Sequence, residues 1–319
     1  METLGNPQNT IAVLQKYKFN FQKKFGQNFL IDTHVLDKII DAAGITEEDF
    51  VLEIGPGIGT MTQYLCENAR EVVAVEIDKN LIPILEDTLS DYRNVTVINQ
   101  DILKLDIPAL AKEKNVRYMV AHVVRFWPGY EALKEIYDTK KYGKLISGTM
   151  QRLGQFPQWS WNNWMQKEEC SGMVPFDLHI HDLDFLVYAF GIPKDKVVFR
   201  AKRSDSDFLN ITYDFGDFFV QTQASWYATK DHPFTACYSF QFEDALVEFR
   251  EERLKIYLRD GGVIDSGGEA GALGAIDLPQ TDAYANEIRY FTDCVENGTD
   301  CEKVRAEELA AVLDILNNV

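Results

Sequence analysis

The chain has 319 residues, of which 46% are hydrophobic and 12% aromatic, and its formal net charge is −18. These values are typical of a folded protein with room for two domains, and they argue against intrinsic disorder. Residues 1–115 carry 11 Lys and Arg against 18 Asp and Glu (net −7), and the remainder carries 21 against 32 (net −11). Because neither half has an excess of positive charge, the composition argues against binding to a nucleic-acid backbone.

Two further classes of protein are disfavoured by the sequence. No apolar run approaches the length of about 18 residues that a membrane-spanning helix needs, and the polar first ten residues lack the apolar core of a signal peptide. We therefore expect a cytoplasmic protein that does not cross a membrane. The five cysteines are scattered and include no CxxC pair, which favours free thiols over disulfides or a structural zinc site.

The first third of the chain alternates between strand-like and helix-like segments. Helices are expected at 11–21, at Thr33–Ala43 with Thr33 as N-cap and Gly44 as the stop, at Thr60–Asn68, at 80–89 and at 130–137; strands are expected at Phe50–Ile54, 72–77, 95–98 and 117–126. This alternation predicts βαβ units in an α/β fold, with a Rossmann-like parallel sheet truncated to about four strands.

The second half has a different texture. Strand-like runs joined by short Gly and Asp turns are expected at 197–202, 208–215, 218–227, 235–242, 246–250 and 254–258, followed by helices at 282–297 and 305–317. Several of the runs alternate apolar and polar residues, which predicts a largely antiparallel sheet with one covered face. We therefore expect a cofactor-binding half at 1–115, a last Rossmann strand and helix at 116–145, and an α+β domain at 146–319.

A glycine-rich turn follows the first of these strands. It contains Gly55, Gly57 and Gly59, with Thr60 where a dinucleotide-binding fingerprint would place its third glycine. Such a turn lets backbone amides approach a ligand at the N-terminus of a helix. Glu76 ends the second strand, where a carboxylate can accept hydrogen bonds from both ribose hydroxyls. Asp101 follows the third strand, where it could bind an adenine amino group.

Four motifs carry a resemblance to a known family. KKFGQNFLID at 23–32, LEIGPGIGT at 52–60, VEID at 75–78 and QDIL at 100–103 resemble the rRNA adenine dimethyltransferases, over roughly residues 11–112. That family dimethylates two adjacent adenines of small-subunit rRNA with S-adenosylmethionine. The resemblance implies that Asn28 and Leu30 line the cofactor site. It also implies that Gly55, with Gly57 in the same turn, meets the methionine part, Glu76 the ribose and Asp101 the adenine.

The sequence departs from that family after the third strand. The family carries an Asn-(Leu/Ile)-Pro-Tyr segment after its fourth strand, in which Asn accepts a hydrogen bond from the target amino group and Tyr stacks on the flipped-out adenine. The corresponding stretch here reads VAHVVRF at 120–126, and the family's basic helical C-terminal domain does not follow. The departure predicts impaired methyl transfer to rRNA.

The rest of the chain resembles a second family, over about residues 118–319. MVAHVVRFWP at 119–128, YGK at 142–144, WSWNNW at 159–164, residues 172–184 and YANEIRYF at 284–291 are similar to the Gfo/Idh/MocA oxidoreductases. These enzymes oxidise or reduce carbons of sugars and polyols with NAD(P), and they suggest a homo-oligomer through the antiparallel sheet. In the family, an Asp four residues before a His acts in acid–base chemistry together with a lysine. The matching pair is Asp177 and His181.

This second resemblance is also incomplete. The lysine normally stands in a Glu-Lys-Pro segment, which does not occur in this sequence, and the family's own NAD-binding turn is replaced by the turn at Gly55. The alternative to an acid–base pair is a metal site made by His179, His181, Asp182 and Asp184, although the family pattern needs no metal. The tryptophans at 159, 161 and 164 could stack on a sugar or pack over a loop. Arg125 could contact substrate or form a structural ion pair.

Three functional hypotheses remain. The chain could be an S-adenosylmethionine-dependent methyltransferase, an NAD(P)-dependent sugar or polyol oxidoreductase, or a non-catalytic product of gene fusion or sequence misassembly. The third is favoured by the join near residue 116, where a strand of one family gives way to a later strand of the other. We expect S-adenosylmethionine binding to survive and both parent activities to be impaired.

Overall fold

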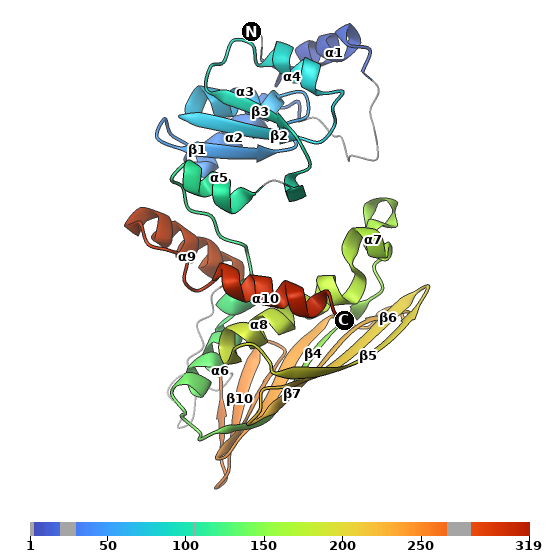
Figure 1. Cartoon of the computed structure of the whole chain (residues 1–319), viewed down its shortest axis with the longest axis vertical. Coiled ribbons are helices and arrows are strands. Elements are labelled where there is room, and N and C mark those ends of the chain that lie inside the picture. Colours follow the sequence, from blue (N-terminus) through green and yellow to red (C-terminus); the bar gives the residue numbers. More distant parts are fainter. Residues whose placement is uncertain (1–2, 20–29, 105, 267–281) are drawn as a thin grey trace. The chain divides into compact units, whose positions relative to one another are not determined.

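The computed structural model describes residues 3–19, 30–104, 106–266 and 282–319, and the chain divides into two compact units, Met1–Tyr118 and Met119–Val319. Each unit has a sheet of its own: three strands in unit 1 and eight strands in unit 2 (Figure 1). The α/β class predicted for the first part of the chain and the largely antiparallel sheet predicted for the second are both confirmed.

Unit 1 is built on a parallel sheet whose strand order is β1-β2-β3. The strands are β1 (Phe50–Ile54), β2 (Glu71–Glu76) and β3 (Val95–Asn99), and the helices are α1 (Pro7–Lys16), α2 (Thr33–Ala43), α3 (Thr60–Asn68), α4 (Ile82–Thr88) and α5 (Ile107–Glu113). The middle strand β2 is buried from Val72 to Glu76. Leu65 and Cys66 of α3 pack against Val72 and against Ile40 of α2, so apolar burial fixes α3 on one face of the sheet.

The ends of the first two helices differ from the prediction. Helix α1 begins at Pro7 and ends at Lys16, earlier at both ends than the predicted 11–21, because Asn6 caps it by accepting a hydrogen bond from the amide of Gln8. Helix α2 has the predicted bounds, but its N-cap is Asp32. The Asp32 carboxylate accepts from the amides of His34 and Val35 at 3.0 and 3.3 Å.

The predicted fourth strand at 117–126 is wrong. Residues 117–122 form no strand, and Val123–Phe126 form the 3₁₀ turn η3. The side chains of Val124, Arg125 and Phe126 are buried in unit 2, where the Arg125 guanidinium pairs with Asp184. Burial and ion pairing in unit 2 therefore determine the conformation of this segment, and the sheet of unit 1 has three strands among the described residues.

Unit 2 contains a mixed, mainly antiparallel sheet with the order β11-β10-β9-β8-β4-β7-β6-β5. Its strands are β4 (Leu145–Gln155), β5 (Asp195–Arg203), β6 (Ser206–Asp214), β7 (Phe219–Tyr227), β8 (Thr235–Phe242), β9 (Ala245–Arg250), β10 (Arg253–Leu258) and β11 (Val263–Asp265). The central strand β4 was not predicted. It pairs in parallel with β7 and antiparallel with β8, and it positions several of the site residues described below.

Helices cover one face of this sheet. They are α6 (Pro128–Asp138), α8 (Ile180–Phe190) and α10 (Ala306–Leu316), whose buried side chains share one core with the strands (Figure 1). Helix α6, which was expected to complete the Rossmann half, thus belongs to the core of unit 2. Helix α9 (Ala283–Asn297) and the short helix α7 (Glu168–Ser171) complete the unit.

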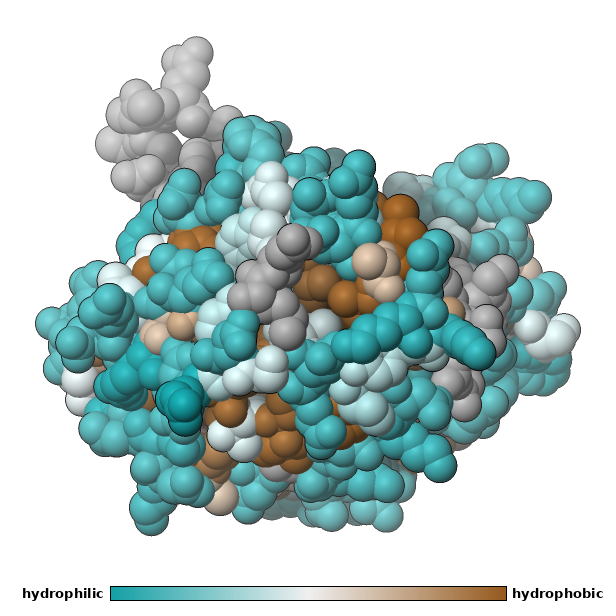
Figure 2. Space-filling view, turned by 90° about the horizontal axis from the view of Figure 1, so that it is seen from above, coloured by the Kyte–Doolittle hydropathy of each residue, from teal (hydrophilic) through white to brown (hydrophobic). Residues whose placement is uncertain are grey.

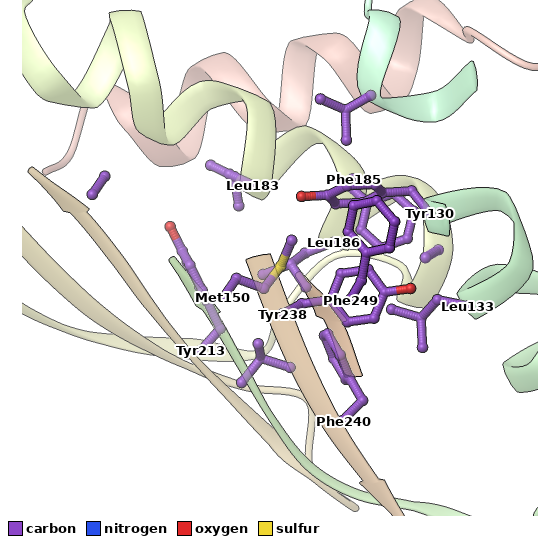
Figure 3. Close-up of a cluster of buried hydrophobic side chains, with 14 of the residues drawn as sticks. Tyr130, Leu133, Met150, Leu183, Phe185, Leu186, Tyr213, Tyr238, Phe240 and Phe249 are labelled. Carbon is purple, nitrogen blue, oxygen red and sulfur yellow. The ribbon is translucent and has the colours of Figure 1, made fainter. Parts of the chain in front are cut away.

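Aromatic side chains dominate the centre of this core. The ring of Tyr130 from α6 lies edge-on to Phe185 of α8, Tyr238 of β8 and Phe249 of β9, with ring centroids 5.0, 5.2 and 5.7 Å apart (Figure 3). The Tyr238 hydroxyl donates a hydrogen bond to the carbonyl of Gly129. Edge-to-face packing of this kind ties a helix to the sheet in one orientation.

One face of the molecule is mostly hydrophilic (Figure 2). In the view of Figure 2 hydrophilic residues predominate, and hydrophobic residues are visible in smaller patches between them. Within the described residues, no helix is both long and apolar enough to span a bilayer.

Candidate functional sites

The glycine-rich turn of unit 1 has the backbone that its sequence predicts. Gly55, Gly57 and Gly59 all have positive φ angles, of 75°, 63° and 93°, a region that side-chain-bearing residues rarely adopt. A Cβ atom at Gly59 would also lie 3.1 Å from the Thr88 hydroxyl. The turn leads directly into helix α3, which begins at Thr60, so the positive end of a helix lies beside the turn.

The strand register brings the three predicted positions to one edge of the sheet. Ile54 at the end of β1 pairs with Val75, and Glu76 at the end of β2 pairs with Asn99 of β3. The amide of Gly55 donates to the carbonyl of Val75 at 2.9 Å. Because the strands are parallel, their carboxyl ends lie along the same side of the sheet. Glu76 is the last residue of β2, and Gly55 and Asp101 come just after the ends of β1 and β3.

Glu76 is joined to the turn by hydrogen bonds. Its side chain is buried, and its two oxygens accept from the amide of Gly57 at 3.1 Å and from the amide of Asp78 at 2.8 Å. Burial raises the pKa of Glu76, and these backbone hydrogen bonds act in the opposite direction. A carboxylate has about four acceptor sites, so Glu76 can hold the turn and still accept from a ligand.

A second carboxyl, Glu53, lies beside Glu76 and was not predicted as a site residue. Burial raises its pKa to about 7, a nearby Thr62 hydroxyl lowers it, and the charge of Glu76 raises it further. Its Oε2 atom is buried without a hydrogen-bond partner among the described residues. The sequence signal was its place two residues before Gly55, but its burial could not be predicted from that position.

The remaining predicted positions of unit 1 are less well defined. Leu30 is half-buried and Asp101 is half-buried just before the 3₁₀ turn η2 (Ile102–Lys104), whereas Asn28 lies outside the described residues. The prediction also missed two apolar residues at the edge: Ile54 and Ile77 are 61% and 50% exposed. They stand directly before Gly55 and after Glu76, where exposed apolar surface suits a nucleoside ring.

Unit 2 has a cleft of about 770 Å³, and one of the two predicted catalytic residues lines it. Asp177 lines this cleft from the π-helical segment η5 (Pro175–His179). Burial raises the pKa of Asp177, and hydrogen bonding by Trp226 lowers it. The cleft is further lined by Gln155, Trp159, Trp226, Lys230, His232 and Phe234. Trp159 is 79% exposed, so its ring is available to a ligand.

His181 lies four residues on, at the start of α8, but does not line the cleft. Burial lowers its pKa to about 4, with Arg152 and His122 adding to this effect and Asp184 opposing it. Its Nδ1 atom has no hydrogen-bond partner among the described residues. His181 is therefore a neutral imidazole near pH 7, and no described hydrogen bond joins it to Asp177.

Three of the four residues weighed as a metal site, His179, Asp182 and Asp184, have other partners. The His179 Nε2 atom lies 2.7 Å from the Tyr213 hydroxyl, Asp182 accepts from the Arg152 guanidinium at 2.7 Å, and Asp184 pairs with Arg125. In the part of the chain that is described, no three His, Cys, Asp or Glu side chains gather as a metal site would require.

Arg125 forms a structural ion pair. Its side chain is fully buried, and Nε and Nη2 donate to the two oxygens of Asp184 at 2.8 and 2.7 Å while Nη1 donates to Glu308 at 2.6 Å. Burial alone would raise the pKa of Asp184, but hydrogen bonds from Arg125 and His122 lower it. Such two-pronged pairing fixes η3 against α8 and α10.

The cysteines are free thiols. All five are free, with Cys66, Cys237 and Cys294 buried and Cys170 exposed. Burial raises the pKa values of Cys66 and Cys237, which disfavours the reactive thiolate.

The comparisons with known proteins also divide the chain into two parts. Residues 18–126 match the ribosomal RNA adenine dimethylase family, and residues 130–263 match the GFO/IDH/MocA C-terminal domain. Over 116 residues the chain is 77% identical to the ribosomal RNA small subunit methyltransferase A of Lachnoclostridium phytofermentans, covering 36% of this chain and 40% of that protein. The chain thus spans well under half the length of the curated relatives it matches.

Solved structures resemble the fold over most of the chain. An oxidoreductase from Agrobacterium radiobacter, solved with NAD⁺, L-tartaric acid and magnesium, aligns with a TM-score of 0.54 at 15% identity, covering 84% of this chain and 94% of that one. Levoglucosan dehydrogenase in complex with NADH and levoglucosan aligns with a TM-score of 0.56 at 14% identity, covering 83% and 94%. At these identities the likeness concerns the fold alone. The chain therefore joins a ribosomal RNA adenine dimethylase domain at residues 18–126 to a GFO/IDH/MocA C-terminal domain at residues 130–263.

Proposed function

We propose that unit 1 binds S-adenosylmethionine across the carboxyl ends of β1, β2 and β3. The observation that carries this proposal is the strand register, which puts the turn at Gly55, the carboxylate of Glu76 and Asp101 on one edge. The chemistry of these groups suits the cofactor, because amides and carboxylates there match its carboxylate, ribose and amino groups. The Oε2 atom of Glu53, which has no hydrogen-bond partner among the described residues, is a further polar group near these strand ends.

The role of each residue follows the rRNA adenine dimethyltransferases. In this proposal the turn at Gly55 and Gly57 meets the methionine part, Glu76 accepts from the ribose hydroxyls, and Asp101 accepts from the adenine amino group. Asn28 and Leu30 line the same site. S-adenosylmethionine supplies the methyl group in that family.

We further propose that methyl transfer to rRNA is impaired. The family's Asn-(Leu/Ile)-Pro-Tyr segment does not occur in this sequence, and the stretch that should carry it forms coil and the turn η3 instead of a strand. A flipped adenine would then lack both its hydrogen-bond acceptor and its stacking ring. The net charge of −18 also disfavours RNA binding.

The second candidate is an NAD(P)-dependent oxidoreductase acting on a sugar or polyol. The cleft lined by Asp177 and the exposed ring of Trp159 favours it, since aromatic rings stack on sugar faces. Against it stand the missing Glu-Lys-Pro lysine, the missing NAD turn and the separation of His181 from the cleft. Oligomerisation through the sheet and a cytoplasmic location belong to this proposal too.

We favour a chain that binds S-adenosylmethionine but carries out neither parent reaction, as a fusion or a misassembled sequence would. The test is a thermal-shift titration with S-adenosylmethionine, S-adenosylhomocysteine, NAD and NADP, because a ligand that binds only the native state raises its melting temperature. The first two should raise it and the last two should not. A shift with NAD alone, or turnover of rRNA or a sugar, would overturn the proposal.

The variant Glu76→Gln tests the site itself. Loss of a charged acceptor for ribose hydroxyls should weaken S-adenosylmethionine binding about 10- to 150-fold, which corresponds to about 1.5–3 kcal/mol. Isothermal titration calorimetry measures this directly. Glu47→Gln, which removes an exposed carboxylate of the same unit, is the matched control and should bind like the unaltered chain. Equal affinities of the two variants would rule out Glu76 as a ligand.

A further inference from the structure

We propose that Glu53 is a second acidic group of the S-adenosylmethionine site, which holds a proton while the site is empty and releases it when the cationic cofactor binds. The inference rests on the function proposed above, and it adds a proton to the binding equilibrium.

The geometry places Glu53 beside Glu76. Glu53 pairs with Ala74 of β2 in the parallel register, and side chains two residues apart on a strand share a face. Glu53 and Glu76 therefore point to the same face of the sheet, just below the turn at Gly55. Helix α3 covers this face, and its buried Thr62 and Cys66 lie next to Glu53.

In the part of the chain that the structure describes, no cation pairs with either carboxyl. The charged or titratable groups that face Glu53 are Glu76 on β2 and Cys66 on α3, while Asp78 acts on Glu76. Burial raises the pKa of the Cys66 thiol to about 12, so this group stays neutral. Within the described residues, no Lys, Arg or His forms an ion pair with Glu53 or Glu76. Burial and Glu76 together raise the pKa of Glu53 to about 7.

The cofactor supplies the missing positive charge. S-adenosylmethionine carries a permanent sulfonium charge and an ammonium group. A cation close to a carboxyl favours its charged form, so binding should lower the pKa of Glu53 and release its proton to the buffer. Ligand affinity should then rise with pH up to about 7 and level off above it.

Calorimetry on the full chain tests this with S-adenosylmethionine at pH 6, 7 and 8, each in two buffers of different ionisation enthalpy. We expect about tenfold weaker binding at pH 6 than at pH 8, with close to one proton released per ligand at pH 6. Because glutamine mimics a protonated glutamate, Glu53→Gln should bind at pH 8 at least as weakly as the unaltered chain does at pH 6. Its affinity should change little with pH. Glu47→Gln should retain the full pH dependence.

Each other outcome counts against the inference. Binding without proton release, or a Glu53→Gln variant that keeps the tenfold dependence, overturns the role of Glu53 while leaving cofactor binding intact. Absence of binding at every pH overturns the proposed function and this inference together. Circular dichroism of Glu53→Gln, matched to the unaltered chain, shows that a loss of affinity does not come from unfolding.

Discussion

The two units bury charge in opposite ways. In unit 2, the buried guanidinium groups of Arg125 and Arg152 are each paired with a buried carboxylate, Asp184 and Asp182. In unit 1, the buried Glu76 and the half-buried Glu53 lie next to each other and form no described ion pair. An ion pair between two buried groups can fix how two elements pack, whereas carboxyls with raised pKa values and no counter-charge are found at ligand sites. The difference supports a structural role for Arg125 and Arg152 and the binding role proposed for Glu76.

The largest effect should come from breaking the pair at Arg125. Arg125→Ala leaves the buried carboxylate of Asp184 without its arginine partner, which should reduce the free energy of unfolding of unit 2 by about 3–5 kcal/mol. All five tryptophans lie in unit 2, so urea denaturation followed by tryptophan fluorescence reports on this unit.

An exposed ion pair of unit 2 provides the control. Lys202 and Glu168 lie 2.6 Å apart with side chains 40% and 53% exposed, and such surface pairs contribute about 0–1 kcal/mol. Lys202→Ala should therefore leave the tryptophan midpoint nearly unchanged. If Arg125→Ala and Lys202→Ala lost the same free energy of unfolding, burial of the Arg125 ion pair would not increase its contribution to stability.

A smaller effect should appear when unit 2 is acidified. His179 is fully buried, and burial lowers its pKa to about 3. The folded state keeps this imidazole neutral, whereas the unfolded chain takes up a proton below about pH 6.5. Stability should therefore fall as pH falls from 6.5, with about 2 kcal/mol lost at pH 5 through His179.

The variant His179→Gln isolates this contribution. Its tryptophan-detected free energy of unfolding should change between pH 7 and pH 5 by about 2 kcal/mol less than that of the unaltered chain. His34→Gln, which alters an exposed imidazole of α2, should change nothing. An unaltered pH dependence in His179→Gln would show that this imidazole is not held neutral by burial.

The smallest effect concerns the cap of a helix in unit 1. Asp32→Ala removes the acceptor for two amides of α2 and should cost about 1 kcal/mol. The loss should lower the midpoint of the unfolding transition of unit 1, which circular dichroism detects and S-adenosylmethionine shifts. The tryptophan-detected midpoint of unit 2 should stay the same. A shift of both midpoints would mean that the two units unfold as one.

The sequence was most informative where local patterns decide the structure. The strands of unit 1 and the positive φ angles of the glycine turn follow from apolar runs and glycine spacing. Strand β4 was missed because its covered face carries Gly148, Met150, Arg152 and Gly154 instead of an apolar alternation. Gly148 is needed there because a Cβ atom would lie 2.3 Å from the ring of Phe240, a contact that sequence alone does not reveal.

For the candidate sites, too, the residues that depend on local patterns could be predicted and those that depend on packing could not. Gly55, Glu76 and Asp101 could be named because each follows a strand of recognisable pattern, and parallel strands place such residues together. Glu53 could not be recognised as buried, since that depends on how α3 packs over β1. The apolar run at 117–126 suggested a strand, but the ion pair of Arg125 with Asp184, 59 residues away in sequence, decides its conformation.

A crystal structure of the full chain with S-adenosylhomocysteine shows where the nucleoside binds. We expect it at the carboxyl ends of β1–β3, with the ribose hydroxyls on the carboxylate of Glu76 and the adenine amino group beside Asp101. A nucleoside bound in unit 2, or at unit 1 away from Glu76, would contradict this expectation.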